Sequence, residues 1–138
     1  MKKLFLTIVL ALASLTSCDS GDSLTDIFLS HPWKLSFFKE GTMITSPSSK
    51  VVYILKFSDT TFTFTTPGGA TISGYWQADN KKRTFKCTQV RVTDGSISGD
   101  TIATKAQNIL KNSRYYEGDA NWLQLQVQDK TYMQFHNK

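Results

Sequence analysis

The stretch WLQLQV (122–127), followed after QDK (128–130) by TYMQFH (131–136), decides the fold of this chain. Both segments alternate apolar and polar residues, which is the period of a half-buried β-strand. Their apolar sets share one face only if the loop has three residues, since a slip of one residue would reverse every side chain. This register pairs Leu125 with Met133. The sequence therefore predicts an antiparallel hairpin with one apolar face and one polar face.

The polar face of this hairpin is a candidate ligand-binding surface. The same register gathers six residues on it: Trp122, Gln124, Gln126, Tyr132, Gln134 and His136. Aromatic planes beside amide donors and acceptors can bind a glycan or the edge of a peptide. The alternative is an ordinary solvent-facing side of an antiparallel sheet.

Working outward, further strands are indicated by the same alternation. With the hairpin they make eight strands, expected at residues 33–39, 51–57, 62–65, 72–76, 84–92, 114–117, 121–127 and 131–136. In the first strand, Trp33, Leu35 and Phe37 share the inward face. The fifth strand changes parity between Cys87 and Val90, so we expect a bulge near residues 88–89.

Three connections and a short N-terminal turn complete the pattern. Residues 41–50 are expected to form a loop, and an even-numbered loop, 58–59 or 58–61, aligns the second and third strands. Asp100 is placed to cap a helix from 101 to about 111, with an apolar stripe that includes Ala106. Residues 22–28 favour a capped helical turn against the barrel rim, ended by the proline at position 32.

The fold class that follows is mainly β. We expect about eight antiparallel strands in a small barrel or two-sheet fold, with one amphipathic helix between strands 5 and 6. The interior should be packed, because the inward set is large: Trp33, Phe37, Tyr53, Leu55, Phe57, Phe62, Phe64, Trp76, Phe85, Leu123, Leu125, Met133 and Phe135.

The N-terminus predicts a secreted, anchored protein. After Lys2 and Lys3, the run LFLTIVLALA (4–13) is apolar but too short to span a bilayer, as in a signal peptide. Leu15-Thr16-Ser17-Cys18 resembles the bacterial lipobox, which implies lipidation of Cys18, with palmitate among the acyl chains, and cleavage before it. We expect residues 1–17 to be the signal peptide, 18–23 the lipidated Cys and tether, and 24–138 a single β domain.

This order of elements resembles the META domain, the small β-rich envelope domain of bacterial heat-shock lipoproteins. The similar features lie along most of the mature chain: Trp33-Lys34-Leu35, YILKF (53–57), Gly74-Tyr75-Trp76, Cys87 before the helix, and the hairpin formed by 122–125 and 133–135. The resemblance implies a lipid-anchored, non-catalytic binding or envelope-stress module on the periplasmic face or outer-membrane surface of a Gram-negative bacterium.

Charge and reactive residues narrow the functions. The formal charge of +5 falls to +3 after signal cleavage, and the longest basic run, Lys81-Lys82-Arg83, lies in a turn signal. We therefore expect no nucleic-acid partner. Cys87 alternates with Phe85 and is expected to be a buried hydrophobe rather than a nucleophile. The histidines, His31 and His136, show no metal or relay spacing.

No metal, cofactor or catalysis is therefore expected. The carboxylates fall in the tether, turns, strand ends or the helix cap, which is poor placement for paired-carboxylate catalysis. Residues 94–100 follow a calcium loop in outline, but its twelfth position is Lys105 instead of a glutamate. The expected partners are the membrane, through the lipid, and an envelope protein or glycan, with the chain a monomer. The alternatives are a lipocalin-like binder of a small ligand or glycan and, third, an enzyme.

Overall fold

The computed structural model describes residues 23–137, so the predicted signal peptide and Cys18 lie outside the described part of the chain. The described residues form nine strands and two helices. In chain order these are η1 (Thr25–Leu29), β1 (Trp33–Glu40), β2 (Met43–Thr45), β3 (Ile54–Phe57), β4 (Thr61–Thr65), β5 (Thr71–Asp79), β6 (Thr84–Asp94), α2 (Thr101–Asn112), β7 (Tyr115–Gly118), β8 (Trp122–Gln128) and β9 (Thr131–His136).

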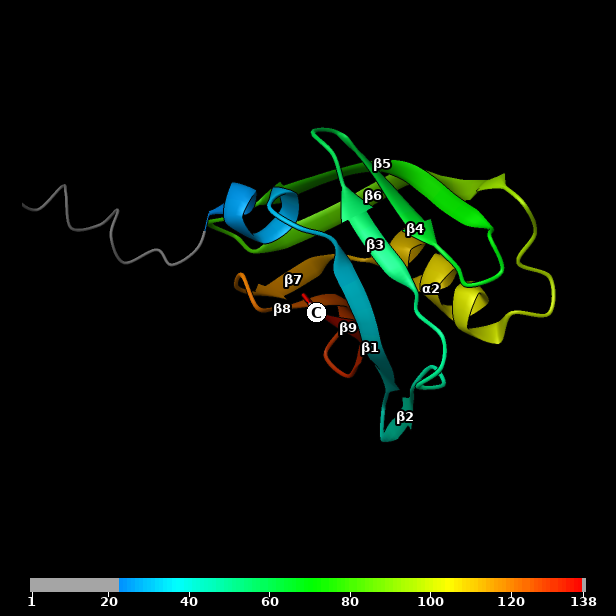
Figure 1. Ribbon diagram of the computed structural model, residues 1–138. Coiled ribbons are helices and arrows are strands. Elements are labelled where there is room, and N and C mark those ends of the chain that lie inside the picture. The colour runs from blue at the N-terminus through cyan, green and yellow to red at the C-terminus, as the bar shows by residue number, and fades with distance from the viewer. Residues whose placement is uncertain (1–22, 138) are drawn as a thin grey trace, which may run out of the picture.

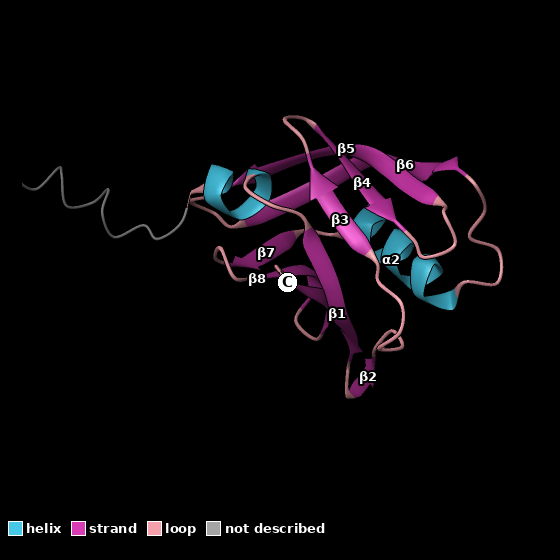
Figure 2. Cartoon of the chain, in the orientation of Figure 1, coloured by secondary structure: helices cyan, strands magenta, loops and turns pink. Residues whose placement is uncertain are grey.

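All strand pairings are antiparallel, and the sheet closes on itself. The order is β2-β1-β3-β4-β5-β6-β7-β8-β9, with a further pairing between β1 and β9 (Figure 1). The mainly β class is confirmed. Strand β2, which pairs with β1, lies in the expected loop 41–50 and raises the strand count to nine. The helix α2 therefore falls between β6 and β7, on the same stretch of chain as predicted (Figure 2).

Two details of the first strands differ from the sequence-based prediction. A β-bulge between Leu35 and Phe37 shifts the register of β1 against β9, so Phe38 is fully buried and Phe37 is not. Placing Phe37 inward was wrong, because strict alternation does not anticipate the extra residue of a bulge. In addition, β3 begins at Ile54 rather than at 51.

The other predicted registers are confirmed. Leu125 pairs with Met133 in the β8–β9 hairpin, but the predicted three-residue loop was wrong: Gln128 pairs with Thr131, so the loop is residues 129–130 and the extra residue is a bulge at Val127. Phe57 pairs with Phe62, which corresponds to the 58–61 loop. The parity change of β6 is a bulge at Gln89, whose φ is +52°. Opposite this bulge stands Gly74, where an added Cβ would lie 2.7 Å from the Thr88 carbonyl oxygen.

The barrel interior is filled with aromatic side chains, and η1 supplies the central one. Phe28 is fully buried, with its ring centroid 4.9 Å from that of Phe57 and 5.6 Å from that of Phe85. Ser23 and Asp26 form a reciprocal capping box, in which the Asp26 amide donates to Ser23 Oγ and the Ser23 amide donates to Asp26 Oδ2. The predicted turn therefore lies at one end of the barrel and inserts Phe28 into the interior (Figure 1).

Helix α2 packs its apolar stripe against the barrel. Its buried residues are Ala103, Ala106, Ile109 and Leu110. Asp100 caps the helix as predicted, because its Oδ1 accepts a hydrogen bond from the Ala103 amide at 2.9 Å. Both oxygens of the same carboxylate also accept from the Tyr53 hydroxyl at 3.0 Å. Neither helix of the described chain is long and apolar enough to cross a membrane.

Candidate functional site

Among the strand pairs of the described chain, β6 and β7 share the fewest paired residues. Strand β6 has 11 residues, but its ladder with β7 is the single pair Thr84 and Tyr115. Two backbone bonds flank this pair, from the Phe85 amide to the Arg114 carbonyl oxygen and from the Tyr116 amide to the Arg83 carbonyl oxygen, both 3.0 Å long. Beyond this pair, α2 takes the place of a strand beside β6.

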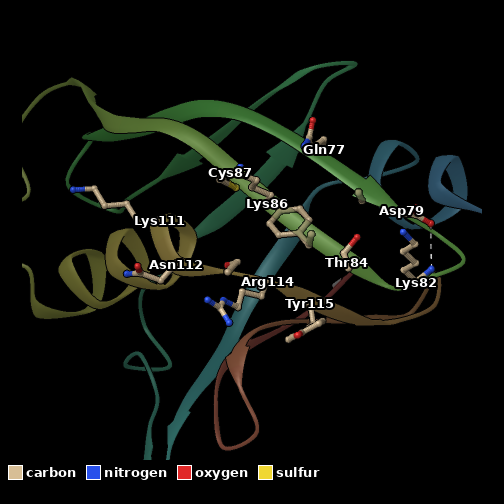
Figure 3. A pocket seen from close by; sticks show the side chains of 13 residues that line it. Gln77, Asp79, Lys82, Thr84, Lys86, Cys87, Lys111, Asn112, Arg114 and Tyr115 are labelled. Atoms are coloured by element: carbon tan, nitrogen blue, oxygen red, sulfur yellow. Dashed lines mark hydrogen bonds between the residues drawn. The ribbon is translucent and has the colours of Figure 1, made fainter.

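An open groove of about 890 Å³ follows this β6–β7 seam, and we call it the seam groove. One side comes from the neighbouring ends of β5 and β6, and the other from the C-terminal end of α2 and the start of β7 (Figure 3). Its lining residues are Gln77, Ala78, Asp79, Lys82, Thr84, Phe85, Lys86, Cys87, Lys111, Asn112, Ser113, Arg114 and Tyr115.

Positive charge dominates the seam groove. Four exposed cations, Lys82, Lys86, Lys111 and Arg114, line it together with one carboxylate, Asp79. Within residues 23–137 the one ion pair lies elsewhere, between Lys105 and Glu40. The four cations therefore have no carboxylate of the described chain as a salt-bridge partner, and they remain free to meet an anion.

The single carboxylate of the groove is engaged by its own turn. Asp79 Oδ1 accepts from the amides of Lys81 and Lys82, at 2.9 and 3.1 Å. These backbone bonds, the Lys82 bond first, lower the pKa of Asp79. Asp79 thus closes the β5–β6 turn and presents Lys82 to the groove.

Neutral polar groups and one aromatic ring complete the lining. Gln77 on β5 and Asn112 at the end of α2 are exposed amides, and Tyr115 is 44% exposed (Figure 3). Below them, Phe85 and Cys87 are buried and form the floor. Burial raises the pKa of the Cys87 thiol, so this cysteine is a protonated, buried hydrophobe, as expected from the sequence.

The surface predicted from the hairpin is assembled but largely occupied by its own contacts. All six residues are half-buried, and the predicted cross-strand neighbours are confirmed. Gln126 Nε2 donates to Gln124 Oε1 at 2.8 Å, and Gln124 Nε2 donates to Gln134 Oε1 at 3.4 Å. His136 Nδ1 bonds the Ser36 hydroxyl. A set of side chains that bond one another has less left to offer a ligand.

The remaining reactive candidates are also engaged. His31 contacts the carbonyl oxygens of Pro32 and Ala120 through its two ring nitrogens, and its ring packs edge-on against Trp33. Lys105, at the twelfth position of the calcium-like loop, bonds Glu40 at 2.7 Å. No three His, Cys, Asp or Glu side chains between residues 23 and 137 are grouped to hold a metal ion.

Sequence analysis missed the seam groove because its cations come from separate parts of the chain. In the sequence, Lys82 belongs to a turn signal, and Lys111 lies at the end of the predicted helix, where positive charge is favourable. Both interpretations are locally correct. The available signal was the pair Lys111 and Arg114, followed directly by the exposed Tyr115, but only the closed barrel brings them opposite Lys86.

Comparison with known proteins identifies relatives without an assigned function. A family described as a domain of unknown function, DUF4847, matches residues 19–137. The crystal structure of a DUF4847 family protein from Bacteroides vulgatus is similar, with a TM-score of 0.62 and 26% sequence identity over 84% of this chain and 98% of that chain. No curated protein matches the chain.

Proposed function

This chain belongs to the DUF4847 family, and on that premise we propose that it is a lipid-anchored, non-catalytic binding module of the cell envelope. The observation that carries the proposal is the contrast between a filled barrel interior and an open groove whose four cations have no carboxylate partner in the described chain. The META resemblance remains a prediction and agrees with this role.

The proposed anchor is the lipobox cysteine. Cys18 lies five positions before Ser23, where the described chain begins, so the domain would sit close to the membrane at its η1 end. Stable anchoring needs two or more acyl chains, because one chain alone gives only reversible membrane binding. The sequence Leu15-Thr16-Ser17-Cys18 supports such modification.

Anchoring is tested with the full chain expressed in a Gram-negative host. We expect the wild-type protein to carry diacylglycerol and fatty acid on Cys18, as measured by mass spectrometry, and to sediment with membranes. Cys18→Ala should remain unprocessed or be released in soluble form. A soluble wild-type protein cleaved at another position would overturn the anchoring proposal.

Binding through the groove is tested by capturing envelope components from the host. The double charge reversal Lys86→Glu with Arg114→Glu should abolish the recovery of a defined component. Lys50→Glu with Lys56→Glu is a matched control, because it changes the net charge equally at exposed positions outside the groove. Equal recovery by wild type and both variants would reject the groove as the binding site.

The calyx alternative stays a prediction and has less support. A ligand inside the barrel would have to displace Phe28, whose ring lies 4.8 to 5.6 Å from four other aromatic rings. A small adduct retained by the purified protein in native mass spectrometry, and lost on unfolding, would favour the calyx over the groove.

A further inference from the structure

We propose that the seam groove binds an acidic oligosaccharide, with its acid groups on the four cations and a sugar ring against Tyr115. This inference rests on the proposed binding function and deepens it, by naming the chemical class of the ligand.

The first argument is the arrangement of charge. Lys82 comes from the β5–β6 turn, Lys86 from β6, Lys111 from the last turn of α2, and Arg114 from the residue before β7. The cations thus border the groove from different elements rather than in one run. Such an arrangement suits a ligand with several separated negative charges, because each acid group meets its own cation.

The second argument is the neutral part of the lining. Tyr115 exposes 44% of its surface at one edge of the groove, and the amides of Gln77 and Asn112 line other parts of it. An exposed aromatic plane packs against the apolar face of a sugar ring. The Gln77 amide can donate to and accept from the sugar hydroxyl groups, and Asn112, whose Nδ2 donates to the Asn108 carbonyl oxygen at 2.8 Å, can accept through its Oδ1. A groove of about 890 Å³ is within the usual size of small-molecule sites.

An acidic peptide is the nearest competing ligand, and the geometry favours it less. A peptide strand added to a sheet needs a free strand edge of several residues. At the start of β6, the Phe85 amide and the Arg83 carbonyl oxygen already bond Arg114 and Tyr116, and α2 packs against the strand farther along. The free edge in the groove is therefore short, so side-chain contacts rather than backbone pairing must hold the ligand.

The test uses the mature lipoprotein in a polyoxyethylene detergent, titrated calorimetrically with a chondroitin sulfate tetrasaccharide. The controls are neutral chitotetraose and a glutamate peptide of the same net charge. We expect the sulfated tetrasaccharide to bind, the neutral sugar to show no binding, and the peptide to bind at least about tenfold more weakly. High salt should weaken the binding, because the contacts are exposed and screened.

Variants locate the site. Lys86→Glu with Arg114→Glu should weaken binding at least tenfold, and the control Lys50→Glu with Lys56→Glu should leave it unchanged. Tyr115→Ala should weaken binding while Tyr115→Phe retains it. Tyr75→Ala serves as the control for the ring, because Tyr75 is similarly exposed, at 47%, and lies outside the groove.

Three results would overturn the inference. Equal weakening by both double variants would mean general charge attraction, and equal binding of the glutamate peptide would mean that the saccharide is not recognised. Absence of tetrasaccharide binding would reject this ligand class. In that case, groove-dependent capture of another envelope component would leave the proposed binding function intact, whereas loss of both would reject the two proposals together.

Discussion

The β8–β9 hairpin and the β6–β7 seam are neighbouring parts of one sheet that are built in opposite ways. The hairpin is joined by six residue pairs and its outer amides bond one another. The seam has one residue pair, and α2 replaces the missing ladder. The first region uses its polar groups for its own structure, whereas the second leaves four cations without a salt-bridge partner among residues 23–137. This difference separates a polar surface that stabilises the fold from one that is available to bind.

The largest effect on the free energy of unfolding is expected at Phe28, which packs against both strands of the seam from inside the barrel. The Phe28 ring packs on Phe85 of β6 and on Tyr116 of β7, so it joins the two strands that hardly pair. Phe28→Ala should lower the free energy of unfolding by about 3–5 kcal/mol, measured by urea denaturation. Phe28→Leu, which keeps most of the volume, should cost clearly less. Equal costs would show that the cavity at this position does not matter.

Helix α2 stands in for the missing strand, and its capping residue Asp100 accepts a hydrogen bond from the Tyr53 hydroxyl. Burial first, and then the hydrogen bond and negative charge of Asp100, raise the pKa of Tyr53 from 10.0 to about 12. The folded state therefore keeps this proton longer than the unfolded state. The stabilisation is complete below pH 10 and is lost between about pH 10 and pH 12, amounting to about 2–3 kcal/mol.

Tyr53→Phe isolates this contribution. The variant should cost about 1 kcal/mol at pH 7, where the hydrogen bonds to Asp100 are lost. It should also show a smaller fall in stability than the wild type when unfolding is followed from pH 9 to pH 12. Parallel profiles for the two proteins would contradict the assignment to Tyr53.

Hydrogen exchange compares the two regions directly. The amides of Phe85 and Tyr116 form the two bonds of the seam, whereas the amides of β8 and β9 belong to a continuous ladder. We expect the seam amides to be less protected by roughly 1–2 kcal/mol, because the seam can open without unfolding the hairpin. Equal protection would mean that packing around Phe28 makes the ring of strands uniformly cooperative.

The hydrogen-bonded amide side chains of the hairpin are expected to stabilise the fold rather than to bind a ligand. Gln124→Ala removes the bonds to Gln126 and Gln134, and it should cost about 1 kcal/mol in urea denaturation. Binding of the tetrasaccharide should be unchanged. A loss of binding without a loss of stability would instead indicate that the hairpin surface is the binding site.

The smallest effect on stability is expected in the groove itself. Lys86 is exposed and has no salt-bridge partner in the described chain. Lys86→Gln should therefore change the free energy of unfolding by less than about 0.5 kcal/mol while weakening tetrasaccharide binding. A substantial destabilisation would instead assign Lys86 a structural role.

The sequence by itself determined eight of the nine strands of the described chain, most of their faces and the residue pairs of the hairpin. Alternation over Trp122–Gln128 and Thr131–His136 allowed one register that buried both apolar sets, and the parity change in β6 required a bulge. Such features depend on residues that are close in sequence, so local patterns contain the necessary information. Phe37 shows the limit of such patterns. A bulge in β1, which no change of alternation in the sequence indicates, places Phe38 rather than Phe37 on the buried face.

Only the tertiary structure decided where the groove lies. Its cations sit on separate elements between Lys82 and Arg114, and each has an adequate local explanation as a charge in a turn, on the exposed face of a strand or at the end of a helix. They meet because closure of the barrel leaves β6 and β7 with one residue pair and places the end of α2 beside them. Charges at exposed positions leave no periodic signal in the sequence, because solvent accepts them in almost any arrangement. Their convergence is therefore a property of the closed barrel.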